Sequence, residues 1–291
     1  MNLSIIIPSR NEGEELFNTT QSIFKFADCE VIVVNDCSDS DKWFDPVGEC
    51  RVIHSKIPIG FAGAIQKGIE AATNENIWIC GARTRFTEGF AEKAIEALEN
   101  EPETLFCIQS AVLRYDQTEI KKSTSTLYGA KIRYYKPGNV MRFLVNIPVK
   151  KPCSGEVDCA YGGSYILKKS LWKKIHGLNG IQTRGGCNQF LSLKTWLSGG
   201  KVKILDQLIG NIYRAQTSYP VGYAEILYNR LYILYVLFGE RAARNALLNF
   251  KDINEYPLIR CAYYNNIEFF KKESAYLLSI KKRNIDQFVK P

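Results

Sequence analysis

A chain of 291 residues with ordinary apolar and charged fractions predicts one large folded domain, or one domain with an appendage. The net charge of +8 favours anionic ligands or partners, such as phosphates, nucleic acid or a membrane surface. Nine cysteines without any Cys-x-x-Cys pair argue against a disulfide framework, and the longest apolar run, 231–238, is too short for a membrane span. The first strand-like run starts at residue 3 and leaves no room for a signal peptide, so we expect a reduced, cytoplasmic protein.

The first 80 residues alternate between strand-like and helix-like segments. Residues at helical spacing follow the acidic segment 11–15 and predict a first helix. A segment of small residues at 60–73 predicts a second helix. Short apolar runs typical of buried parallel strands occupy 3–8, 30–34, 52–53 and 77–80. This order predicts a doubly wound α/β sheet, which binds ligands beyond the carboxyl ends of its strands. The turns expected around that crevice are 9–12, 35–39 and 81–83.

The second half of the chain is richer in basic and aromatic residues. From about residue 222 its pattern is helical, so we expect one domain over 1–220 and a helical C-terminal extension over 221–291. Before that point the patterns predict a hairpin strand at 128–135, strands at 159–167 and 201–205, and helices at 168–176 and 189–197.

A series of motifs carries a resemblance to a known family. They are Ile-Ile-Ile-Pro-Ser-Arg-Asn-Glu at 5–12, Val-Val-Asn-Asp-Cys-Ser-Asp at 33–39, Gly-x-x-x-Ala-x-x-x-Gly at 60–68, Ala-Tyr-Gly-Gly-Ser-Tyr-Ile-Leu-Lys-Lys at 160–169, Arg-Gly-Gly-Cys-Asn-Gln at 184–189 and Gly-Asn-Ile-Tyr-Arg at 210–214. Together they resemble GT-A-fold glycosyltransferases of family 2 type, above all the polypeptide N-acetylgalactosaminyltransferase branch. The resemblance implies an α/β fold with a Rossmann-like nucleotide-binding half and a mixed sheet. It also implies sugar transfer from a nucleoside-diphosphate donor, with UDP as the nucleotide.

The resemblance also assigns roles to single positions. The loop Pro8, Ser9, Arg10, Asn11 and Glu12 matches residues that line the nucleoside, and Asp36 matches the carboxylate that bonds to the uracil ring. Arg214 and Tyr219 match contacts to the diphosphate, and we assign sugar or acceptor contacts to Gly163, Gly186 and Asn188. Structural roles stay open beside these, because Asn11 and Glu12 could cap a helix and Asp36 could shape a turn.

The expected metal site departs from the family pattern. The Asp-x-Asp or Asp-x-His motif falls on Gly81, Ala82 and Arg83, and a later metal-binding histidine falls on Asn211. Glycine and alanine have no side-chain ligand for Mg²⁺ or Mn²⁺, which prefer oxygen or imidazole donors. The two histidines, at positions 54 and 176, match no ligand position. We therefore expect no divalent metal cofactor.

Two functional interpretations follow. In the first, Arg83 replaces the cation, because a guanidinium binds phosphate through two parallel hydrogen bonds and keeps its charge. Arg85, Arg214 and Lys67 could reinforce it, and the enzyme would be a metal-independent glycosyltransferase of the retaining branch. In the second, the chain binds a nucleotide sugar or a partner without catalysis, because the acid of the family's Gly-Gly-Glu-Asn motif falls on Cys187.

Further candidates concern catalytic groups and the acceptor. Glu156 and Asp158 could act as a base if the reaction inverts, and Cys187 could be a nucleophile, although no histidine is near it in sequence. The segment 121–151 mixes eight basic residues with aromatic ones. This composition permits nucleic acid, such as a modified base in DNA, as the acceptor, and equally a hairpin that stacks on sugars or peptides.

Overall fold

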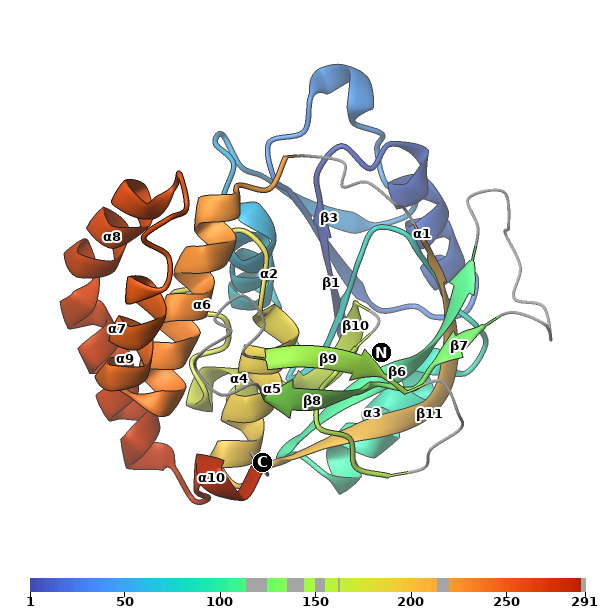
Figure 1. Ribbon diagram of the computed structural model, residues 1–291. Helices are drawn as coiled ribbons and strands as arrows, with labels where there is room; N and C mark the ends of the chain where they lie inside the picture. Colours follow the sequence, from blue (N-terminus) through green and yellow to red (C-terminus); the bar gives the residue numbers. More distant parts are fainter. Residues whose placement is uncertain (114–124, 135–143, 150–154, 162, 214–219, 289–291) are drawn as a thin grey trace.

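The computed structural model describes residues 1–113, 125–134, 144–149, 155–161, 163–213 and 220–288. In these residues a nine-stranded mixed sheet carries helices on both faces, and two further strands form a separate two-stranded sheet (Figure 1). The strands of the large sheet are β1 (Ser4–Ser9), β2 (Glu30–Asn35), β3 (Cys50–His54), β4 (Asn76–Cys80), β5 (Thr84–Arg85), β6 (Thr104–Leu113), β7 (Thr126–Leu127), β10 (Ser164–Lys168) and β11 (Lys201–Ile212).

The strand order divides the large sheet into two halves. The order is β3-β2-β1-β4-β10-β6-β11-β5, with β7 paired to β6. Neighbours among the first four strands are parallel, whereas β10 is antiparallel to both β4 and β6. The first half is therefore the Rossmann-like unit that the sequence predicts, and β10 joins it to a mixed second half.

The alternating side chains of the central strands explain the two layers of helices. Ile5 and Ile7 of β1 belong to one buried cluster, whereas Ile6 belongs to the other, because successive residues of a strand point to opposite faces. The first cluster packs against α1 (Glu14–Phe24) and α3 (Phe90–Asn100). The second contains residues of α2 (Gly60–Ala71) and α5 (Cys187–Leu197).

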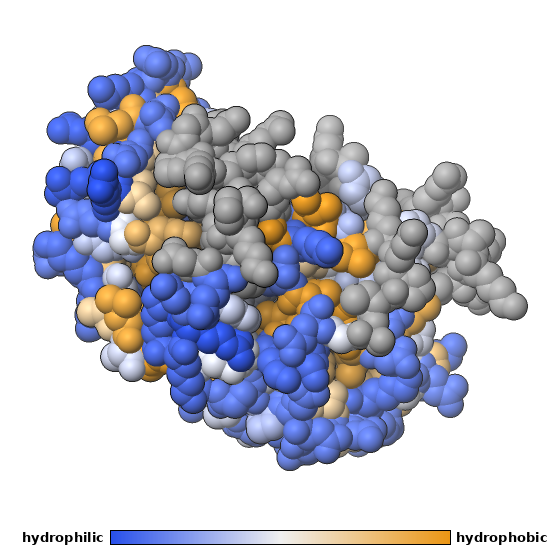
Figure 2. Space-filling model, turned by 60° about the horizontal axis from the view of Figure 1, so that its bottom comes forward, coloured by the Kyte–Doolittle hydropathy of each residue, from blue (hydrophilic) through white to orange (hydrophobic). Residues whose placement is uncertain are grey.

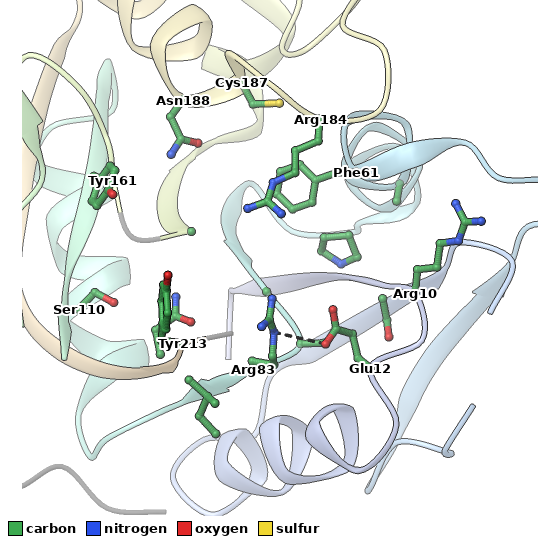
Figure 3. A pocket seen from close by; sticks show the side chains of 18 of the residues that line it. Arg10, Glu12, Phe61, Arg83, Ser110, Tyr161, Arg184, Cys187, Asn188 and Tyr213 are labelled. Atoms are coloured by element: carbon green, nitrogen blue, oxygen red, sulfur yellow. Dashed lines mark ion pairs between the residues drawn. The ribbon is translucent and has the colours of Figure 1, made fainter. Parts of the chain in front are cut away.

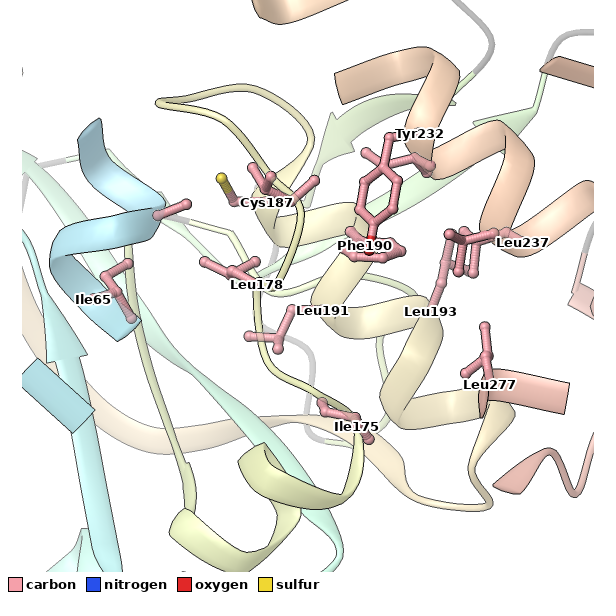
Figure 4. Close-up of a cluster of buried hydrophobic side chains, with 14 of the residues drawn as sticks. Ile65, Ile175, Leu178, Cys187, Phe190, Leu191, Leu193, Tyr232, Leu237 and Leu277 are labelled. Carbon is pink, nitrogen blue, oxygen red and sulfur yellow. The ribbon is translucent and has the colours of Figure 1, made fainter. Parts of the chain in front are cut away.

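The C-terminal helices extend this second cluster. They are α6 (Tyr223–Phe238), α7 (Glu240–Leu248), α8 (Tyr256–Asn265), α9 (Ile267–Ile280) and α10 (Ile285–Phe288). Phe190 of α5 meets Tyr232 of α6 edge to face at 5.4 Å between ring centroids, and Tyr232 lies 5.0 Å from Phe270 of α9. Figure 4 shows α5 between α2 and α6, with its apolar side chains directed to both. Residues on both sides of position 220 thus share one core, and the domain boundary there stays a prediction.

Most of the predicted elements are present. The predicted hairpin strand is β8 (Ala130–Tyr134), which pairs antiparallel with β9 (Leu144–Pro148), and α4 (Lys169–Lys174) is the predicted short helix. The strand predicted at 201–205 is wrong in length, because β11 continues past a bulge between Leu205 and Leu208 and reaches Ile212. The extra residues carry β11 to the carboxyl end of the sheet, where it meets β5.

On the face shown in Figure 2, hydrophilic residues cover most of the described surface, and hydrophobic ones gather near its centre, beside the residues drawn in grey. Across the described ranges, no helix combines the length and the apolar character needed to cross a bilayer.

Candidate active site

A cavity of about 550 Å³ opens at the carboxyl ends of β1, β2 and β4, where a parallel sheet of this kind is expected to bind its ligand. Its position agrees with the crevice predicted from the three turns. The lining residues include Pro8, Ser9, Arg10, Glu12, Asp36, Phe61, Ala64, Gly81, Ala82, Arg83, Ser110, Val112, Leu127, Tyr161, Gly163, Arg184, Gly185, Gly186, Cys187, Asn188, Gln189, Asn211, Ile212 and Tyr213.

Arg83 lies in the turn between β4 and β5, on the floor of the cavity as drawn in Figure 3. Its Nε lies 3.3 Å from Oε2 of Glu12, and the two side chains are 22% and 10% exposed. The backbone of the turn is held as well, because the Ile212 amide donates to the Arg83 carbonyl at 3.0 Å. The pair therefore fixes a guanidinium against the cavity while leaving part of it accessible to a ligand.

Asp36 lines the cavity and also caps a helix. Its Oδ1 accepts from the Ile59 amide at 2.5 Å and its Oδ2 from the Gly60 amide at 3.0 Å. These amides belong to the start of α2, where N–H groups lack partners inside the helix and a negative charge is favourable. Asp36 thus has a structural role as a cap on α2, which differs from the turn role weighed in the sequence analysis, while a uracil contact stays a prediction.

Asn11 shapes the loop and is not among the lining residues. It has a left-handed backbone conformation, with φ of 56°, which asparagine adopts more readily than most residues. Its Oδ1 accepts from the Asp39 amide at 2.8 Å, and its own amide donates to Oγ of Ser38 at 3.0 Å. Asn11 therefore joins the loop after β1 to the loop after β2, and its four predicted neighbours Pro8, Ser9, Arg10 and Glu12 line the cavity.

Arg184 enters the cavity from the wall opposite Arg83 (Figure 3), and the sequence analysis gave it no role. It belongs to the loop between α4 and α5, which a buried residue of α6 holds in place. The Asn229 side chain accepts from the Gln182 amide at 2.7 Å and donates to the carbonyls of Gln182 (2.7 Å), Gly185 (3.2 Å) and Arg184 (3.3 Å). The loop rests on α2 too, since the Ala62 amide donates to the Thr183 carbonyl at 3.0 Å.

The predicted sugar or acceptor residues Gly163, Gly186 and Asn188 all line the cavity. Gly186 precedes α5 with φ of 78°, which side chains other than glycine rarely adopt, and a Cβ there would lie 2.4 Å from the end of the Ile233 side chain, so the position favours glycine. In Figure 3, Asn188 lies on the same side of the cavity as Tyr161, Ser110 and Tyr213, away from Arg10. These side chains offer hydroxyl, amide and aromatic groups but no carboxylate.

Cys187 also faces the cavity, at the first position of α5. Burial raises the pKa of its thiol to about 11, so the thiol stays protonated near neutral pH. Because the thiolate is the reactive form, the structure gives no support to a nucleophilic role.

Several other candidates lie away from the cavity or outside the described residues. Arg85 is paired with Glu15 at 2.6 Å in a buried ion pair and does not line the cavity. Asp158 accepts from the Ile132 amide at 3.0 Å, and Glu156 pairs with Lys201 at 3.3 Å. Arg214 and Tyr219 lie outside the described residues, as does much of the segment 121–151.

The side chains present do not suit a divalent metal. The described residues contain no cluster of three His, Cys, Asp or Glu side chains that could hold an ion. Among the described lining residues, the carboxylates are those of Glu12, which is paired with Arg83, and Asp36, whose two oxygens accept from backbone amides. The histidines lie elsewhere: His54 contacts Asn35 and Trp43, and His176 pairs with Glu273.

The profile of the family described as "Glycosyl transferase family 2" matches residues 4–154, more than half of the chain. The chain belongs to glycosyl transferase family 2. Among curated relatives of this family 2 protein, polypeptide N-acetylgalactosaminyltransferase 10 of Rattus norvegicus is 23% identical over 237 residues, covering 76% of this chain and 39% of the relative. Polypeptide N-acetylgalactosaminyltransferase 5 of Caenorhabditis elegans is 23% identical over 241 residues, covering 74% of this chain and 38% of the relative. The chain thus spans less than two fifths of the length of these relatives.

Solved structures confirm the GT-A fold of the family 2 protein. GalNAc-T7, crystallised with UDP, GalNAc and Mn²⁺, superposes with a TM-score of 0.69 at 17% identity, covering 96% of this chain and 58% of that one. Residues 1–349 of TarS from S. aureus, in complex with UDP-GlcNAc, give a TM-score of 0.52 at 12% identity, covering 99% of this chain and 84% of that one.

Proposed function

We propose that this family 2 protein is a glycosyltransferase that uses a nucleoside-diphosphate sugar, with UDP as the nucleotide, and that Arg83 acts in place of a divalent metal. The observation that carries the proposal is the turn after β4. There the cavity presents a guanidinium held by Glu12, together with Gly81 and Ala82, where a metal-dependent relative needs acidic ligands. GT-A relatives that bind UDP or UDP-GlcNAc support the choice of donor.

In this proposal the nucleoside lies over the loop Pro8–Glu12 and the diphosphate lies against Arg83. Transfer breaks the bond between the anomeric carbon and the diphosphate oxygen, and forms a bond from that carbon to an acceptor hydroxyl oxygen. Negative charge grows on the departing diphosphate, and a guanidinium fixed in advance stabilises it through charge-assisted hydrogen bonds. The acceptor proton passes to the leaving diphosphate oxygen in a retaining reaction, which requires no separate base.

The absence of a carboxylate at position 187 fits this retaining course. Cys187 is a protonated thiol, and Asn188 and Gln189 are neutral, so the wall beside the sugar has no general base in this stretch of the described chain. The acceptor stays open, and the aromatic side chains of Tyr161 and Tyr213 suit a sugar, a peptide or a nucleobase.

The test is hydrolysis of a panel of UDP-sugars in the presence of excess EDTA. We expect turnover to survive chelation and to fall by at least about a hundredfold in Arg83→Ala, because removal of one preorganised donor to developing charge has that effect. Arg83→Lys should recover part of the loss, since it keeps the charge without the planar fork.

Arg241→Ala is the matched control, because Arg241 is an exposed arginine of α7, away from the cavity. Its turnover should equal that of the unchanged protein. Turnover that vanishes with EDTA and returns with Mn²⁺ would refute the metal-independent role. Tight binding of UDP without turnover of any donor would instead identify a binding module.

A further inference from the structure

Arg83 alone does not supply enough positive charge to balance the diphosphate in the site proposed above. A divalent metal contributes two charges, whereas Arg83 contributes one and already interacts with Glu12 at 3.3 Å. A nucleoside diphosphate carries at least two negative charges. A single, partly compensated guanidinium therefore leaves the ligand underneutralised.

Arg184 is the group placed to supply the missing charge. Its side chain and that of Arg83 extend toward each other from opposite walls in Figure 3, one from the loop before α5 and the other from the turn after β4. The dashed line that marks an ion pair among the residues drawn there joins Arg83 to Glu12, and none reaches Arg184. Two like charges that face one cavity repel each other until an anion lies between them.

Hydrogen bonds within the protein hold the backbone of the loop that carries Arg184. The loop therefore does not need a ligand to keep its position. Asn229 of α6 is fully buried and makes four hydrogen bonds to the backbone of residues 182–185. The Thr183 hydroxyl adds a bond to Oε2 of Glu225 at 2.7 Å. Asn229 is thus a positioning residue, and the helical C-terminal segment contributes to the site through it.

We infer that Arg184 and Arg83 form a two-arginine clamp that holds the donor's diphosphate from opposite sides. This inference rests on the proposed function, whose ligand it completes. The two guanidinium groups together carry the formal charge of a divalent metal, and Arg184 makes up for the part of the Arg83 charge that Glu12 offsets. Because guanidinium binds phosphate oxygens in pairs, the clamp also fixes the orientation of the leaving group.

The test is the preference for UDP over UMP, measured by isothermal titration calorimetry with EDTA present. UMP lacks the second phosphate, so a clamp residue should matter far more for UDP. We expect Arg184→Ala to reduce that preference by about tenfold or more, the usual effect of losing hydrogen bonds to a charged group. Arg184→Lys should keep part of the preference that Arg184→Ala loses. The control Arg241→Ala should leave the preference unchanged.

The double variant Arg83→Ala/Arg184→Ala completes the cycle. We expect its loss of UDP affinity to differ from the sum of the single losses, because both residues bind one ligand. An unchanged preference for UDP over UMP in Arg184→Ala would overturn the clamp while leaving the proposed function standing. A preference that depends on Arg184 in a protein that turns over no donor would keep the clamp and overturn the enzyme, and no UDP binding at all would overturn both.

Discussion

Single side chains at the cavity have structural tasks beside their predicted binding roles, and Asp36 is the clearest case. Replacing it with alanine removes two accepted hydrogen bonds from the first amides of α2. We expect Asp36→Ala to lower the free energy of unfolding by about 1–2 kcal/mol, the usual cost of losing a helix cap. Urea unfolding without nucleotide measures this loss. Asp41→Ala, in the exposed 3₁₀ helix Ser40–Lys42, should stay within about 0.5 kcal/mol of the unchanged protein. An equal effect of both variants would contradict the capping role.

At the scale of elements, α6 determines the shape of the Arg184 loop. Asn229→Ala leaves the Gln182 amide and three carbonyls without their buried partner. We expect unfolding to become easier by about 1–3 kcal/mol and the amides of residues 182–186 to exchange faster with deuterium. Hydrogen exchange followed by mass spectrometry measures the second effect. Asn245→Ala, on the exposed face of α7, should change neither quantity. Unaltered exchange of this loop in Asn229→Ala would rule out the positioning role.

The elements also show which features the sequence could predict. The strands β1, β2 and β4 are short apolar runs, so local pattern was enough to find them. The same kind of signal marks α3 and β6, which the sequence analysis did not predict: Phe90, Ala94 and Leu98 recur at helical spacing, and 104–113 is largely apolar. The position of β10 between β4 and β6 is different, since pairing between strands distant in sequence leaves no local pattern.

The residues of the candidate site also divide into those that local patterns could predict and those that they could not. Glu12, Asp36 and Arg83 were expected around one crevice because they follow strands, and all three line the cavity. Pro8, Gly186 and Asn188 received their predicted roles from the family resemblance, and they line the cavity too. Arg184 was not expected, because the direction of its side chain depends on a loop that α6 holds from more than forty residues away. A pattern confined to its own segment could not reveal that dependence.

At the scale of the whole molecule, the core between the sheet and the C-terminal helices contains a buried titratable amine, that of Lys194. Lys194 of α5 is 3% exposed, and its Nζ donates to the Gly177 carbonyl at 2.5 Å and lies 4.1 Å from the Phe190 ring centre. Burial lowers the pKa of this amine from 10.5 to about 7. The unfolded chain therefore holds a proton that the folded chain releases between these two values, and stability should rise with pH from about 7 upward.

The measurement is urea unfolding at several pH values from about 7 to about 8.5. The free energy of unfolding should rise with pH, with a slope that approaches but does not exceed about 1.4 kcal/mol per pH unit. Above pH 9 the buried thiols act in the opposite direction, because burial raises their pKa values and the unfolded chain loses those protons first. Lys194→Met should remove the rise. A midpoint that stays level in the unchanged protein would contradict the shift.

The ion pair between Glu12 and Arg83 has a consequence for the end of the reaction cycle. A metal ion can depart together with the nucleotide product, whereas a side chain stays behind and must exchange one anionic partner for another. With the proposed donor, Glu12, whose Oε2 lies 3.3 Å from the Arg83 Nε, keeps its contact with the guanidinium and balances its charge once UDP has left, which lowers the electrostatic cost of product release.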